Sequence, residues 1–110
     1  MQIEKKEGFS LITFDNQPFS NLFKSFLEFE KTNKEENIII QFSKDVNILK
    51  EDFFLFLSIA KQKKENGTSF VIINDEIEID DFPEYFNIIP TLQEAEDIIE
   101  MENIERELGF

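Results

Sequence analysis

The sequence contains no cysteine and no histidine, and these two absences exclude many functions. Without cysteine, the chain cannot form disulfides, thiolate nucleophiles or zinc-thiolate sites. Without histidine, it has no hydrolytic triad, no imidazole general base and no histidine-ligated zinc or iron. A cysteine-free chain also suits a reducing compartment. We therefore expect a cytoplasmic protein that is not an enzyme and needs no metal or other cofactor.

Basic residues and long apolar runs are also scarce. The chain has 11 Lys and Arg against 24 Asp and Glu, a formal net charge of -13. Nucleic acids and anionic membrane surfaces would repel it, so we expect neither as a partner and predict that a charged protein partner would be basic. The charge could also serve solubility alone. No segment approaches the ~20 apolar residues of a spanning helix, and the N-terminal sequence MQIEKKEGFS lacks the apolar stretch of a signal peptide.

Large apolar side chains are plentiful. The 110 residues include fourteen Phe, enough with Ile and Leu to fill the core of one small domain, which we assign to residues 1–110. Two short runs on either side of Gly8 predict a hairpin whose second strand is Phe9–Phe14. From Phe19 the apolar spacing is that of one helical face, up to a polar run that begins at Lys31.

The middle of the chain predicts a parallel sheet. Ile38–Phe42 and Ser69–Asn74 are apolar runs typical of strands that are covered on both faces. The spacing between them predicts a helix over Leu49–Glu65 that ends at Asn66-Gly67. A helix between two such strands implies a right-handed βαβ crossover. The fold class is therefore α/β, with a mixed sheet of four to five strands.

The last third begins with an acidic segment and ends in a capped helix. Pro83 suggests the start of a short helix, and the apolar run from Asn87 is long enough for an edge strand only. Thr91 and Glu94 have the spacing of a capping box and predict a helix up to Gly109. We expect its buried face to comprise Leu92, Ala95, Ile98, Ile99 and Leu108, with Met101 or Ile104 contributing.

With this order of elements, the chain resembles the STAS family, the sulfate transporter and anti-sigma factor antagonist domain. Residues 37–73 carry most of the likeness, through an IIIQF strand, a loop, an apolar helix that ends in Gly67, and an SFVII strand. The sequence IIPTLQEAEDII is similar to the last strand and helix of the family. The resemblance implies a STAS-like fold and a non-enzymatic, regulatory protein-binding module.

More narrowly, the closing run PTLQEAEDIIEMENIERELGF resembles small STAS-like proteins of Bacteroidetes, some of which carry the label ribonuclease Z. Enzymes of that type hold two zinc ions through a histidine-rich motif, and a metal-bound water attacks the phosphodiester. A chain without histidine or cysteine, with so much negative charge, cannot work in that way. We therefore interpret the label as inapplicable to this sequence.

In STAS antagonists, a serine at the start of the second core helix is phosphorylated and switches off binding. The resemblance places Lys50 and Glu51 where the two family serines stand, so the chain has no hydroxyl there to modify. Glu51 could imitate a phosphorylated serine, or Glu51 and Asp52 could simply complement the helix dipole. The resemblance implies a partner-binding surface at this helix start, and we list its candidate residues as Asp45, Asn47, Lys50, Glu51, Asp52 and Phe54.

Four alternatives remain open. Phe54 could be covered by the last helix or form part of an exposed apolar patch. The acidic run over residues 75–84 could bind a hard cation, but it lacks the spacing of an EF-hand loop, and we predict no metal site. Small-ligand or nucleotide binding is the competing function, although no glycine-rich phosphate loop is present. A homodimer formed through the long last helix is a third possible function, besides protein binding and small-ligand binding.

Overall fold

The computed structural model describes residues 1–109, which form five strands and several helices. In chain order the elements are β1 (Gln2–Lys6), β2 (Phe9–Phe14), α1 (Phe19–Thr32), β3 (Ile38–Phe42), α2 (Lys50–Phe54), α3 (Leu57–Glu65), β4 (Phe70–Ile73), the short 3₁₀-helix η1 (Ile79–Asp81), β5 (Asn87–Ile89) and α4 (Leu92–Glu107).

The strands form one mixed sheet with the order β1-β2-β3-β4-β5. β1 is antiparallel to β2, and Gly8, with a φ of 92°, lies in the turn between them. The other neighbouring strands are parallel. The predicted hairpin, the parallel βαβ core and the α/β fold class are therefore confirmed.

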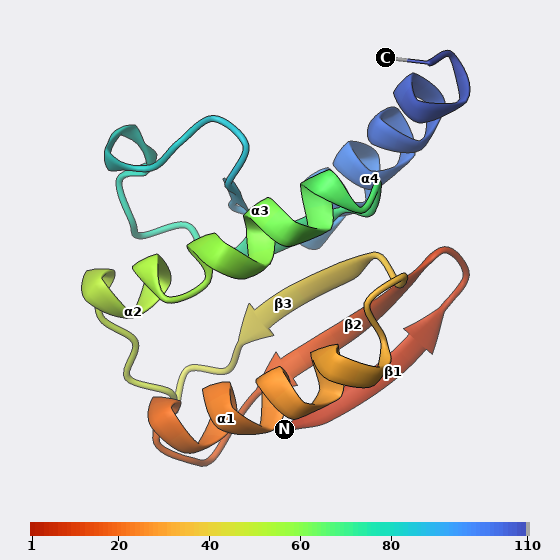
Figure 1. The fold of residues 1–110 in the computed structure, drawn as a ribbon. Helices are drawn as coiled ribbons and strands as arrows, with labels where there is room; N and C mark the ends of the chain where they lie inside the picture. Colours follow the sequence, from red (N-terminus) through yellow and green to blue (C-terminus); the bar gives the residue numbers. More distant parts are fainter. Residues whose placement is uncertain (110) are drawn as a thin grey trace.

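Helices cover both faces of the sheet (Figure 1). Because strand side chains alternate between faces, Ile38 and Ile40 point to one side and Ile39 to the other. The first face packs against α1, α2, α3 and the segment before β5, and its core contains eight buried Phe. On the second face, Leu11, Ile39 and Val71 pack against two residues of α4, Ala95 and Ile99.

From β2 to β5, each parallel strand lies on the same side of the strand before it. Side chains of α1, of α2 and α3, and of the segment between β4 and β5 all belong to the core of the first face, so all three connections cross that face. In open α/β sheets, small ligands usually bind where the strand order reverses. This sheet has no such reversal among its described strands, and therefore no crevice of that kind.

The helix predicted over residues 49–65 is interrupted, and this part of the prediction is wrong. At Leu55 and Phe56 the backbone stays right-handed, but the amides bond three residues back, Leu55 N to Asp52 O at 3.1 Å and Phe56 N to Phe53 O at 3.1 Å. A 3₁₀ turn has three residues per turn, so side chains three apart point the same way. Phe53 and Phe56 are thus both buried.

The short helix expected at Pro83 is also wrong. The helical turn lies earlier, at η1, and the chain from Pro83 makes a single turn closed by Phe86 N bonding to Pro83 O at 3.0 Å. Before η1, the side chain of Asn74 accepts from the amides of Glu76 and Ile77 at 2.9 and 3.0 Å. These local bonds hold the acidic segment in a folded loop.

The last helix begins as predicted but exposes part of the face that was expected to be buried. Thr91 Oγ1 accepts from the Glu94 amide at 3.2 Å, which confirms the N-cap. Ala95 and Ile99 are buried and Ile98 is half-buried, whereas Leu92, Met101, Ile104 and Leu108 are exposed. In the last turns, Glu102 and Arg106 occupy the side of α4 that faces the sheet. The apolar side chains on the other side of these turns therefore point outward.

Candidate functional site

The six candidate residues lie near the carboxyl ends of the parallel strands, but in two groups. Asp45 and Asn47 line an open hollow of about 480 Å³ beside the start of α1. Lys50 lines a second hollow, of about 330 Å³, together with the loop that follows β4. Asp45 and Asn47 therefore line a different hollow from Lys50.

Two of the charged candidates on α2 make local contacts. The Lys50 ammonium pairs with the Asp81 carboxylate of η1, and this hydrogen bond raises the pKa of Lys50. The Asp52 carboxylate accepts from the Leu49 amide at 2.9 Å, at the start of α2. Asp52 therefore stabilises the start of the helix, which agrees with the interpretation that these acids serve the helix terminus. Glu51 lies exposed on the same turn.

Phe54 is neither buried under α4 nor isolated. Its ring lies on that of Phe82, with centroids 4.6 Å apart, and 41% of the residue is exposed. Of the two alternatives for Phe54, cover by the last helix is wrong because α4 packs on the opposite face of the sheet. Leu49 and Leu55, which flank α2, and Ile79 of η1 are also exposed, and we call Leu49, Phe54, Leu55 and Ile79 the α2 patch.

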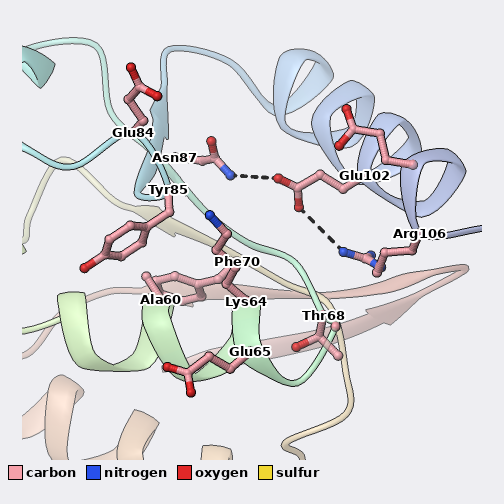
Figure 2. Close-up of a pocket in the computed structure, with 12 residues that line it drawn as sticks. Ala60, Lys64, Glu65, Thr68, Phe70, Glu84, Tyr85, Asn87, Glu102 and Arg106 are labelled. Carbon is pink, nitrogen blue, oxygen red and sulfur yellow. Dashed lines mark hydrogen bonds and ion pairs between the residues drawn. The ribbon is translucent and has the colours of Figure 1, made fainter. Parts of the chain in front are cut away.

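A polar hollow of about 480 Å³ lies near the amino ends of β4 and β5, between α3, β5 and α4 (Figure 2). There the Glu102 carboxylate accepts from Ser69 Oγ at 2.5 Å and from Asn87 Nδ2 at 3.2 Å. Arg106 donates to Ser69 Oγ at 3.1 Å and to Asn103 Oδ1 at 2.6 Å. Because these groups satisfy one another, the network fixes α4 on β4 and β5.

Sequence reasoning missed this network. The spacing of Glu102 and Arg106, four residues apart on a helix, was the available signal, since it places both on one side. Their partners Ser69 and Asn87 come from strand ends that are distant in sequence. Only the register of β4 and β5 beside α4 brings them together.

A buried ion pair joins α1 to α3. Lys63 Nζ lies 3.2 Å from Glu30 Oε1 and donates to the Lys34 carbonyl at 3.3 Å. Burial raises the pKa of Glu30, against the opposing effect of Lys63, and burial lowers the pKa of Lys63. Desolvation thus outweighs the mutual attraction of the two charges, as is common for buried pairs.

Within residues 1–109, no group of three or more acidic side chains is placed to hold a metal ion. In the same range, no helix has the length and apolar character needed to cross a bilayer.

The fold and surfaces define an α/β protein with a five-stranded mixed sheet. No known protein-family model matches the sequence, and no curated protein is similar to it.

Proposed function

We propose that this protein is a STAS-like, cytoplasmic, non-enzymatic module that binds another protein through the α2 patch. The observation that carries the proposal is the exposure of four large apolar side chains, Leu49, Phe54, Leu55 and Ile79, on two adjoining elements. Phe54 packs on Phe82 and Lys50 pairs with Asp81, which brings α2 and η1 together, and exposed apolar side chains gathered in this way are typical of interaction sites.

The charges around the patch favour a basic partner. The exposed carboxylates are those of Glu51 on α2, Asp80 on η1 and Glu78 just before η1. The Lys50 ammonium, the nearby positive charge, is paired with Asp81. Charge complementarity of this sort selects partners and speeds association more than it adds affinity. Apolar contact with the patch would supply the affinity.

The first turn of α2, which holds Glu51, offers no hydroxyl for a kinase to modify. Glu51 stands on this exposed turn, where the STAS resemblance implies a switch serine, and a carboxylate there carries its charge without a kinase. Its charge of one is smaller than the −1.5 to −2 of a phosphate. We therefore propose that regulation by phosphorylation at this turn is absent.

Small-ligand or nucleotide binding is the competing function. Two observations weigh against it: the strand order has no reversal to form a crevice, and carboxylates dominate the loops at the carboxyl ends of the strands. A thermal-shift panel of nucleotides tests this alternative, and a concentration-dependent stabilisation would favour it.

The test of the proposal is affinity capture with cross-linking from the source cells, using the wild type and Leu55→Asp. Leu55 is half exposed, so the change should remove partners without unfolding the protein. Phe54→Asp is the second variant, with thermal melting to check its fold because Phe54 packs on Phe82.

The matched control is Ile3→Asp, since Ile3 on β1 is 40% exposed and Phe54 is 41% exposed. We expect a partner that is retained by the control and lost from both patch variants. If folded Leu55→Asp recovers the same proteins as the wild type, the α2 patch is not the binding surface.

A further inference from the structure

The last turns of α4 carry apolar side chains on the side that faces away from the sheet. Met101, Ile104 and Leu108 are 52%, 50% and 67% exposed. Their spacing of three and then four residues places them on one helical face. In Figure 1 these turns, drawn in blue, extend beyond the other elements. We call Met101, Ile104 and Leu108 the α4 strip.

The inner side of the same turns is polar, and it fixes the direction of the strip. Glu102 and Arg106 point toward the hollow of Figure 2 and bond to Ser69 and Asn87. Rotating α4 to bury the strip would break all of these bonds. The outward direction of the strip is therefore a stable property of the fold, and its apolar surface is available to a partner.

The flanks of the strip decide which partner fits. When apolar residues repeat in this pattern, the neighbouring positions set the choice of partner through their charge. Here those positions are acidic: Glu100, Glu105 and Glu107 are exposed beside the strip, and Asp97 lies one turn before Met101. A second copy of this chain would bring carboxylates against carboxylates, in either orientation of the two helices.

We propose that the α4 strip binds an amphipathic helix of a partner protein whose apolar seam is flanked by Lys or Arg. This surface is distinct from the α2 patch, which lies on elements of the other face of the sheet. The strip spans seven residue steps, or about 10 Å at 1.5 Å per residue. So short a seam gives a weak, salt-sensitive contact, in the range of transient interfaces.

The test uses a labelled synthetic peptide of three heptads with Leu at the core positions and Lys at the flanking positions. Its lysines oppose self-pairing, so it is free to bind the strip. Fluorescence anisotropy measures its affinity for the full chain, for the double variant Met101→Ser/Ile104→Ser, and for Ile79→Ser. Ile79 is the matched control, because it is an Ile of the α2 patch with 56% exposure, against 50% for Ile104.

We expect the double variant to bind the peptide at least about tenfold more weakly, a loss of about 1.4 kcal/mol, and Ile79→Ser to bind it as the wild type does. Replacing Glu100 and Glu105 by Gln should weaken binding and reduce its salt dependence. A peptide with Glu at the flanking positions should not bind.

Three results would overturn the proposal: no binding of the lysine peptide, equal binding by wild type and double variant, or a dimer of the protein alone that the double variant abolishes. Equal binding would mean that the peptide binds elsewhere, at the α2 patch if Ile79→Ser weakens binding and through overall charge if it does not. The dimer would identify a second copy as the occupant. Ile79→Ser separates this proposal from the function proposed for the α2 patch, because a peptide bound at that patch would respond to Ile79→Ser and not to the double variant.

Discussion

The two faces of the sheet are built from different side chains. On the face covered by α1, α2 and α3, buried Phe rings contact one another, and Phe56 alone pairs with five others: Phe14, Phe19, Phe23, Phe26 and Phe70. On the α4 face the buried residues are aliphatic and few. Free energy of folding should therefore be concentrated on the aromatic face, and α4 should be the helix that detaches most easily.

The largest effect is expected for Phe56→Ala. Phe56 is fully buried at the centre of the aromatic face, and truncation of a buried Phe costs about 3–5 kcal/mol. Chemical denaturation should show a loss of unfolding free energy in this range. Phe54→Ala, two positions earlier but half exposed, should lose much less. Equal losses would mean that the aromatic face is not the main source of stability.

A loss of about 3 kcal/mol is expected for Lys63→Met, because it leaves the Glu30 carboxyl group buried without its partner. The double change Glu30→Met/Lys63→Met removes both charges and should restore the unfolding free energy to the wild-type value or above. Denaturation of the three proteins measures this coupling. A double variant less stable than the wild type would show that the pair is net stabilising.

On the other face, Ile99→Ala should cost about 2 kcal/mol, the lower end for such a change, because few neighbours surround Ile99. Hydrogen exchange should locate the effect, with amides of α4 exchanging faster and those of β3 unchanged. Acceleration throughout the sheet would show that α4 unfolds together with the aromatic face.

Removing the cap of the same helix should have a smaller effect. Thr91→Ala deletes the acceptor for the Glu94 amide and should cost about 1 kcal/mol, whereas Thr91→Ser keeps the bond and should be close to neutral. Thermal or chemical denaturation distinguishes the two. Equal losses from both substitutions would assign the effect to the lost methyl group.

The smallest expected signal is a pH dependence. Burial raises the pKa of Glu30 above its usual 4.5, so the folded protein holds a proton that the unfolded chain has lost. The contribution of Glu30 to stability is thus fully present below pH 4.5 and is lost as the pH rises through the folded pKa. The unfolding free energy of the wild type, relative to that of Glu30→Gln, should fall as the pH rises through this window. A difference between the two proteins that does not change with pH would contradict this prediction.

The sequence predicts much of the fold because its signals are local. The runs around Ile38 and Phe70 are long enough to identify buried strands, and Thr91 marks its helix by a bond three residues away. The break after Phe54 was missed because four consecutive apolar residues fit any helical face. Only packing against the aromatic core determines that Phe53 and Phe56 are the buried ones.

The candidate site was predicted less well than the fold. The position of α2 after β3 follows from chain order, but the cover of Phe54 by Phe82 and the pairing of Lys50 with Asp81 depend on where the loop after β4 folds back. That loop has little apolar periodicity. The exposed side chains of α4 were assigned to the core because helical spacing defines a face without saying which way it points.

The position of α4 in the chain has a consequence for synthesis. Leu11, Ile39 and Val71 become available to pair in the sheet before α4 has left the ribosome, and α4 supplies the residues that cover them. During that interval the growing chain presents an apolar sheet face to its surroundings, a condition that promotes association between unfinished chains. Completing the last helix therefore ends the period in which nascent copies are most prone to aggregate.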